Sequence, residues 1–132
     1  MNHDDVQAWL DHYINAWQTY DEGAIRELFS EDAEYRYHPW DEPVRGRDRI
    51  VQDWINPSGD ASRRDAPGSW AAAYAPYAVD DDVAVAVGTT TYWKDGTRAE
   101  LLREYHNAFL LAFDADGHCR SFTEFFMKTA HP

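Results

Sequence analysis

The segment Arg98–Asp114 constrains the fold more than any other part of the sequence. It contains neither Gly nor Pro, and it is bounded by the turn-forming pairs Asp95-Gly96 and Asp116-Gly117. Successive residues of a strand point to opposite faces of a sheet, and near the C-terminal end of this segment both sets of alternate residues are largely apolar. The segment therefore predicts a long strand in the middle of a strongly curved antiparallel sheet, with both faces covered.

The two faces of this strand differ in character. One set of alternate residues combines polar side chains with aromatic ones, which is typical of a pocket wall with a polar end; its members are Leu101, Arg103, Tyr105, Asn107, Phe109, Leu111 and Phe113. On the opposite face, Ala108, Leu110 and Ala112 would form an exposed apolar patch unless a partner covered it. We therefore expect a homodimer that forms through the outer face of the sheet, with His106 near the subunit contact.

Composition and charge limit the possible partners. The chain has 132 residues, of which 44% are hydrophobic and 15% aromatic, so it predicts one globular domain, residues 1–132. Its 24 acidic residues against 12 basic ones give a net charge of -12. A surface of this sign repels phosphate backbones and anionic lipids, so nucleic acid and membranes are not expected as partners.

No segment of the sequence indicates export or membrane insertion. The first residues are acidic and lack the apolar core of a signal peptide. The longest apolar run, Ala108–Phe113, is far too short to cross a bilayer. Cys119 is the single cysteine, so no internal disulfide can form, and a reducing cytoplasm is the simplest location.

Helical periodicity predicts three helices in the first half of the chain. The residues of Asp4–Tyr20 place one apolar stripe at helical spacing, formed by Val6, Trp9, Leu10, Tyr13, Trp17 and Tyr20. Asp21 is a suitable N-cap for a short second helix with Ile25, Leu28 and Phe29 on one side. A third helix follows Gly46, with an apolar side formed by Ile50, Val51, Trp54 and Ile55.

Strands dominate the second half. A short strand is predicted over Glu34–Tyr37, before a proline-rich bend at 38–43, and hairpin strands over Trp70–Val79, Val83–Trp93 and Cys119–Lys128. Residues 56–69 show no periodicity and predict an exposed loop, which is either a lid or disordered. Helices that precede a run of antiparallel strands indicate an α+β fold. We expect the three N-terminal helices to pack in the concave side of the curved antiparallel sheet, giving a cone with an open mouth.

This order of elements resembles the nuclear-transport-factor-2-like superfamily, and within it the SnoaL-like and ketosteroid-isomerase-like small proteins. The resemblance covers nearly the whole chain and rests on three stretches, which are Asp21–Ala33, Val44–Val51 and Phe122–Met127. It implies a cone-shaped α+β barrel with a small-molecule pocket. The superfamily contains isomerases, dehydratases, cyclases, epoxide hydrolases and members without activity, so the fold narrows the function little.

The resemblance also places individual residues. Tyr13 falls where ketosteroid isomerases carry the tyrosine that donates to the substrate oxygen. Their catalytic aspartate falls at or next to Tyr37-His38-Pro39, where this chain has no aspartate, and their second oxyanion-hole acid falls near Phe109. Steroid isomerisation is therefore not expected, and His38 and Tyr13 are the groups that remain at these positions.

Two ionisable residues are candidates for proton transfer. His38 is either a general base, since histidine titrates near neutral pH, or a structural residue of the bend. Glu124 lies between Phe122 and Phe126 in the sequence, and burial would raise its pKa toward neutrality. Alternatively, Glu124 is a buried carboxylate that pairs with Arg103 or accepts a hydrogen bond from a tyrosine.

The remaining candidates would bind the ligand. Arg103 either holds a substrate carboxylate or enolate through two hydrogen bonds or pairs with Glu124, and Asn107 either orients a carbonyl or satisfies backbone groups. The aromatic candidates form a box for a flat ligand or plain core, and the number of tyrosine hydroxyls favours a cavity because buried hydroxyls need partners. They are Tyr13, Trp17, Tyr35, Tyr37, Trp54, Trp93, Tyr105, Phe109, Phe122 and Phe126.

Two functions of different class fit these residues. The first is a cofactor-independent enzyme, an isomerase, dehydratase or cyclase, that abstracts a proton from a small apolar carbonyl compound, with Tyr13 and Asn107 holding the oxygen and His38 or Glu124 moving the proton. The second is a non-catalytic module for ligand binding or dimerisation. No cofactor is expected, and no metal site, because His3 and His12 are too far apart on the first helix and His118 has no second ligand pair.

Overall fold

The computed structural model describes residues 1–130 and contains three α-helices, α1 (His3–Thr19), α2 (Glu22–Leu28) and α3 (Arg47–Ile55). Their N-termini follow local sequence signals. Asn2 and Asp5 form a capping box that starts α1, and the Asp21 side chain accepts the backbone N–H of Ala24 at 2.8 Å, which confirms the predicted cap of α2. Gly46 precedes α3 with a φ of 92°, a conformation that favours glycine.

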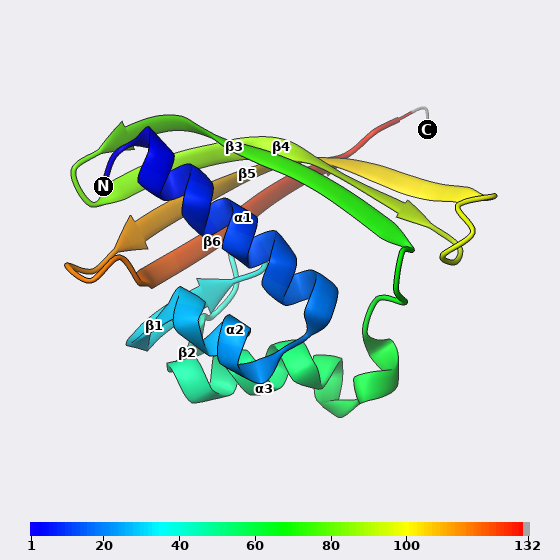
Figure 1. Ribbon diagram of the computed structural model, residues 1–132, viewed down its shortest axis with the longest axis horizontal. Helices are drawn as coiled ribbons and strands as arrows, with labels where there is room; N and C mark the ends of the chain where they lie inside the picture. Colours follow the sequence, from blue (N-terminus) through cyan, green and yellow to red (C-terminus); the bar gives the residue numbers. More distant parts are fainter. Residues whose placement is uncertain (131–132) are drawn as a thin grey trace.

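Six strands form one twisted sheet with the order β2-β1-β6-β5-β4-β3. The strands are β1 (Phe29–Arg36), β2 (Val44–Arg45), β3 (Trp70–Asp80), β4 (Val83–Trp93), β5 (Leu101–Phe113) and β6 (Cys119–Lys128). In Figure 1, α1 lies across the inner face of β3 to β6, while α2 and α3 lie on the same side next to β1 and β2. The predicted α+β fold, with three helices packed on the inner side of one sheet, is confirmed, and β2 and β3 remain unpaired with each other, so the sheet does not close.

The predicted antiparallel arrangement holds for β3 to β6 but not for the pairing of β1 with β6. Strands β3 to β6 are antiparallel neighbours, but β1 runs parallel to β6, with Tyr35 opposite Phe122. A parallel neighbour needs a long connection, and the whole stretch from α3 to β5 provides it. The result is a mixed sheet whose two ends carry different elements.

The starts of two strands differ from the predictions, and one strand was not predicted. Strand β1 begins at Phe29, which was assigned to the preceding helix, because Phe29 pairs with Cys119 and is fully buried. Strand β2 was missed, since two residues are too few for a periodic signal. Strand β5 begins at Leu101 rather than Arg98, because Arg98 adopts a φ of 58° within the hairpin loop that Lys94 and Glu100 close.

Aromatic and aliphatic side chains pack α1 against the inner face of the sheet. Val6, Leu10 and Ala16 are fully buried, and the ring of Trp9 packs edge-on against Phe113 while its N–H donates to the Leu28 carbonyl at 3.0 Å. At the other end of the helix, Trp17 stacks on Trp70 with 3.5 Å between ring centroids. The aromatic stripe predicted from helical spacing therefore joins α1 to both ends of the sheet.

Small residues on β4 let large rings approach the sheet. The inward-facing positions of this strand include Ala84, Ala86 and Gly88. A Cβ atom on Gly88 would lie 1.9 Å from the Ala73 carbonyl oxygen and 2.6 Å from the Tyr74 ring. Glycine at this position therefore allows the Tyr74 ring to lie against the strand.

No element of residues 1–130 covers the outer face of the sheet. Leu110 is 47% exposed there, and the expected cover by a second copy of the chain stays a prediction. Val83, Val87, Phe125 and Met127 are exposed on the same face, and we call these four residues together with Leu110 the outer patch.

None of the helices in the described residues is both long enough and apolar enough to cross a membrane. The cytoplasmic location stays a prediction.

Replacing Gly88 with alanine tests the close approach of Tyr74. We expect Gly88→Ala to lower the free energy of unfolding by about 1–3 kcal/mol, because the added methyl group forces the backbone of β3 or the Tyr74 ring to move. The matched control is Gly23→Ala, on a helix where the new methyl group meets only ordinary contacts, and it should raise stability by up to about 1 kcal/mol. Denaturant unfolding measures both, and equal stabilities for Gly88→Ala and the wild type would contradict the account.

Candidate functional site

A cavity of about 360 Å³ lies between the inner face of the sheet, α1, α3 and the segment 56–69. This volume is at the small end of the range for ligand pockets. Ten of the residues predicted for the site lie on its wall, and they come from α1, β1, α3, β5 and β6: Tyr13, Trp17, Tyr35, Tyr37, Trp54, Arg103, Tyr105, Asn107, Glu124 and Phe126. The structure thus brings together side chains separated by more than half the sequence.

Three aromatic residues predicted for the site do not line this cavity. Phe109 and Phe122 are fully buried beneath it, and the Phe122 ring lies stacked against Tyr35, with centroids 4.3 Å apart. Both therefore support the wall rather than form it. Trp93 packs instead under the guanidinium of Arg98, 4.4 Å from the ring centroid, because the residue that faces inward at this end of β4 is its neighbour Tyr92.

Several wall residues were not predicted from the sequence. On β4, the inward face carries Thr90 and Tyr92 among small residues. The alternation of Trp70, Ala72 and Tyr74 on β3 would have indicated Tyr74 if the inward face had been assigned. Tyr20 was predicted on the apolar stripe of the first helix but not for the site, and Asp53 is a polar residue of α3. The other missed wall residues, Pro57, Arg63 and Asp65, come from the segment 56–69, which carries no periodic signal.

The segment 56–69 is an ordered part of the wall rather than a structureless loop. It contains two short 3-10 turns, Pro57–Gly59 and Ala61–Arg63. The Asp65 carboxylate accepts the indole N–H of Trp17 at 2.9 Å, and the Asp65 backbone N–H donates to the Tyr20 hydroxyl at 3.0 Å. These bonds attach the segment to the C-terminal end of α1, beside the mouth of the cavity.

Four polar side chains form a hydrogen-bonded chain across β3, β4, β5 and β6. The Thr90 hydroxyl donates to Oδ1 of Asn107 at 2.8 Å, so its single hydrogen is used, and the Tyr74 hydroxyl must donate to Thr90 at 2.5 Å. Because Oδ1 of Asn107 accepts, its Nδ2 group faces Glu124 and donates to Oε1 at 3.3 Å. The chain fixes the orientation of the amide and gives Glu124 a donor.

Burial raises the pKa of the Glu124 carboxyl from 4.5 to about 7. The hydrogen bond from Asn107 and the positive charge that His38 carries when protonated oppose this rise. Within residues 1–130 the Oε2 atom of Glu124 accepts no hydrogen bond, and Glu124 lies on the cavity wall. The group can therefore exchange a proton with a bound molecule near neutral pH.

Two tyrosine hydroxyls meet at the inner end of the cavity. The hydroxyls of Tyr13 and Tyr35 lie 3.0 Å apart, and both side chains are buried. Burial, together with nearby acidic groups, raises the pKa of both, so both stay protonated at neutral pH. One hydrogen bond between two hydroxyls uses one of their two hydrogens. The second hydrogen is left to donate to an oxygen atom of a ligand.

A third tyrosine faces the cavity from the end of β1. The Tyr37 hydroxyl donates to the Asp53 carboxylate of α3 at 2.7 Å. Burial and the Asp53 charge raise the pKa of Tyr37 well above its ordinary value. This bond links α3 to the residue that follows β1 and occupies the Tyr37 hydrogen, so Tyr37 contributes its ring to the cavity.

Arg103 does not pair with Glu124, which answers one of the two alternatives left open by the sequence. Its guanidinium lies over the ring of Tyr92, 4.4 Å from the centroid, with Tyr105 at 5.9 Å. Within the described residues it forms neither an ion pair nor a hydrogen bond. The nearby Asp65 is held by Trp17 instead.

His38 lies outside the main cavity. Its Nδ1 atom is 2.8 Å from the Asp41 carboxylate, and its ring stacks on the exposed ring of Trp40. It lines a second, outer hollow, and the two hollows share Asn107, Glu124 and Phe126 on their walls. His38 can therefore affect Glu124 through its charge but does not face a molecule in the main cavity.

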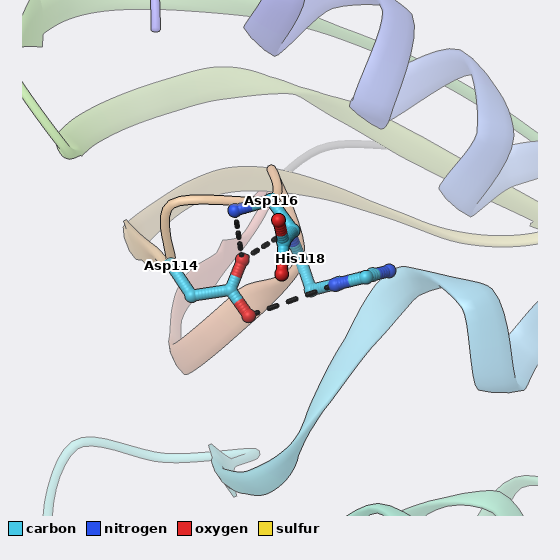
Figure 2. A group of neighbouring side chains, drawn as sticks. All are labelled: Asp114, Asp116 and His118. Carbon is cyan, nitrogen blue, oxygen red and sulfur yellow. Dashed lines mark hydrogen bonds and ion pairs between the residues drawn. The ribbon is translucent and has the colours of Figure 1, made fainter.

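One group of three potential metal ligands lies in the described part of the chain, at the turn between β5 and β6. Figure 2 shows that Asp114, Asp116 and His118 come from this one turn, and their ligand atoms lie within 4.8 Å of one another. Asp114 Oδ1 accepts the backbone N–H groups of Asp116 and His118, each at 2.9 Å. These bonds explain the cluster as a stabilised turn, and it carries no metal assignment.

Comparison with known proteins gives a family. A family model described as a SnoaL-like domain matches residues 10–122. A search of curated proteins finds no significant match.

Solved structures with the same fold are numerous. A ketosteroid isomerase-like protein from Erwinia carotovora atroseptica has a TM-score of 0.66 at 15% identity, covering 95% of each chain. The epoxide hydrolase/cyclase-like enzyme SalBIII, described in pyran ring formation in the polyether salinomycin, has a TM-score of 0.66 at 14% identity, covering 92% of this chain and 89% of its own. A protein from Sphaerobacter thermophilus has a TM-score of 0.64 at 16% identity, covering 92% and 94%. At these identities the likeness shows the fold alone.

The raised pKa of Glu124 predicts how stability depends on pH. In the folded protein Glu124 keeps its proton up to about pH 7, whereas in the unfolded chain it loses the proton near pH 4.5. The stability that the protonated carboxyl contributes is therefore complete below pH 4.5 and is lost as the pH rises to about 7. The Glu124→Gln variant has no carboxyl to ionise at this position, so its stability should not fall in this way. As the pH rises from about 5 to 8, we expect its free energy of unfolding, relative to that of the wild type, to increase by up to about 3 kcal/mol.

Denaturant unfolding at several pH values measures this difference. The control is Glu27→Gln, which changes an exposed carboxylate on α2 and should follow the wild-type curve. Parallel curves for the wild type and Glu124→Gln across this pH range would show that Glu124 is not buried in a costly ionised form.

Proposed function

The chain belongs to the SnoaL-like domain family, and from this premise we propose that it is a cofactor-independent enzyme that moves a proton on a small, mostly apolar carbonyl compound. Isomerisation, dehydration and cyclisation are the reactions of this kind. The observation that carries the proposal is the Glu124 carboxyl, which has a pKa of about 7 and a free oxygen on the wall of an aromatic cavity. A proton-transfer group works best when its pKa is close to the operating pH.

Glu124 takes the proton in this scheme. Its ionised form removes a hydrogen from the carbon next to the substrate carbonyl, and the electron pair of the broken C–H bond moves onto the carbonyl oxygen as an enolate. Protonated Glu124 then returns the proton to another carbon in an isomerisation, or to a departing hydroxyl group in a dehydration. The Asn107 amide keeps the carboxyl in place through the bond to Oε1.

The tyrosine pair stabilises the charge on the oxygen. The free hydrogen of the Tyr13 and Tyr35 hydroxyls points to a ligand oxygen at the inner end of the cavity, where developing negative charge is favoured by a fixed donor. The surrounding rings exclude water, which strengthens this hydrogen bond. His38, which the sequence suggested as the base, acts only by adjusting the pKa of Glu124.

A non-catalytic ligand-binding module is the second candidate. It is supported by the extent to which polar groups on the wall already bond one another, as in the chain from Tyr74 to Glu124. In that case the raised pKa of Glu124 is a consequence of burial without a role in chemistry. Turnover separates the two candidates, because binding alone exchanges no hydrogen.

Hydrogen exchange on enolisable ketones tests the chemistry. In heavy water, we expect the wild type to exchange the hydrogens next to the carbonyl in members of a panel of aryl and cyclic ketones, at rates that rise with pH through about 7 as Glu124 ionises. Glu124→Gln should lower the rate by roughly 100-fold. Proton NMR of the ketone measures the exchange.

Glu27→Gln serves as the matched control and should keep the wild-type rate, since its side chain is exposed on α2. An unchanged rate in Glu124→Gln would remove Glu124 from the mechanism. Binding of the ketones without exchange by any variant would favour the ligand-binding module.

We also propose that two copies of the chain associate through the outer patch. The patch runs across β4, β5 and β6, where Ala108 lies opposite both Val87 and Phe125. Apolar side chains on three adjacent strands give one continuous surface, and a surface of this kind on a single chain marks a contact with another. The inner face of the sheet is occupied by the helices, so only the outer face is available.

Sedimentation of a charged variant tests this association. At micromolar concentration the wild type should sediment as a dimer, whereas Leu110→Lys should sediment as a monomer with unchanged folding by circular dichroism, because a charge is costly to bury at an apolar contact. Tyr77→Lys is the control, since Tyr77 is 74% exposed on β3 and lies outside the patch. A monomeric wild type would exclude the dimer.

A further inference from the structure

Arg103 is a cation on the cavity wall, and within residues 1–130 no carboxylate forms an ion pair with it. The chain carries twice as many acidic as basic residues, and Arg26, Arg45 and Arg120 each form ion pairs at the surface. Arg103 is half-buried, so its guanidinium is partly shielded from water and is available to an anion from outside the chain.

The acidic groups of the cavity are occupied by neutral donors. Asp65 accepts the indole N–H of Trp17, and Asp53 accepts the Tyr37 hydroxyl. Burial raises the pKa of Asp65, while the Trp17 bond and the charge of Arg103 counteract this. Asp65 therefore lies near Arg103 and orients toward another group.

The guanidinium packs on an aromatic ring, and its N–H groups donate no hydrogen bond within residues 1–130. Its Cζ atom lies 4.4 Å from the centroid of the Tyr92 ring. Five donors in one plane match the two oxygens of a carboxylate and bind it through two parallel hydrogen bonds. Contact with the ring restricts the side chain, so less side-chain entropy is lost when Arg103 binds an anion.

Arg103 lies at the opposite end of the cavity from the proton-transfer group. Arg103, Tyr105 and Asn107 face the cavity at every second position of β5, which places the Cα atoms of Arg103 and Asn107 about 13 Å apart at strand spacing. Asn107 contacts Glu124. A molecule that touches both Glu124 and Arg103 must be elongated.

We propose that the substrate is an elongated carbonyl compound with a terminal carboxylate, which Arg103 binds while the reacting carbon lies at Glu124. The inference rests on the proposed function, since it takes this cavity as the substrate site. Aromatic rings between the two ends accommodate an apolar middle section. The cavity thereby distinguishes an acid from its neutral ester, although the net charge of -12 repels anions in general.

Binding of acids and their esters tests the proposal. The probes are aryl keto acids of the benzoylpropionate type, with methylene spacers of increasing length, and the methyl ester of each. For at least one spacer length the wild type should bind the acid at least about tenfold more tightly than the ester, because a charge-assisted pair is lost in the ester. Isothermal titration calorimetry measures both affinities.

Variants assign the preference to one residue. Arg103→Gln should abolish the preference by weakening acid binding while ester binding stays within about twofold, which also shows that the cavity is intact. Arg49→Gln, which changes an exposed arginine of α3 outside the cavity wall, should keep the preference. Absence of a preference across the whole series, persistence of it in Arg103→Gln, or its loss in Arg49→Gln would each overturn the proposal.

The same probes separate this inference from the chemistry. A preference for the acid that persists in Glu124→Gln, with no hydrogen exchange in the wild type, would support the anion site and refute the proposed reaction. Exchange that depends on Glu124 and proceeds equally on acid and ester, with equal affinities, would support the reaction and refute the anion site.

Discussion

The cost of burying an ionised carboxylate at Glu124 governs the candidate site. Aromatic rings surround the group, and a single amide from Asn107 is too little to offset the lost hydration, so the pKa rises to about 7. Three other features of the site can be described by their position relative to this carboxyl. The tyrosine pair supplies a neutral donor, Arg103 supplies a distant cation, and His38 lies on the other side of Glu124 and opposes the shift.

Small and large side chains have different roles in forming this arrangement. Small residues on β4 allow Tyr74 to lie against the sheet, and Phe109 and Phe122 fill the space beneath the cavity. The large rings of α1 then pack at both ends of the helix, over Phe113 at one end and Trp70 at the other. Between these contacts Tyr13 packs on Phe122, with ring centroids 5.5 Å apart, and forms part of the cavity wall.

Local patterns predicted the helices, the hairpins and the inward face of β5, because these depend on spacing along the chain. They did not reveal that β1 runs parallel to β6, since that pairing joins segments distant in sequence. Glu124 was identified by its apolar sequence context and Tyr13 by family resemblance. Asp53 and Asp65 were missed because, like the parallel pairing, their place in the site depends on contacts between distant segments. Their positions depend on how α3 and the segment 56–69 dock against the sheet.

Glu124 titrates near neutral pH in the folded protein, and NMR measures this titration directly. With carbon-13 in the glutamate side chains, the carboxyl resonance that disappears in Glu124→Gln can be followed against pH. Its midpoint should be about 7. A midpoint near 4.5, the ordinary value for glutamate, would show that the carboxyl is solvated like a surface group and would contradict the account.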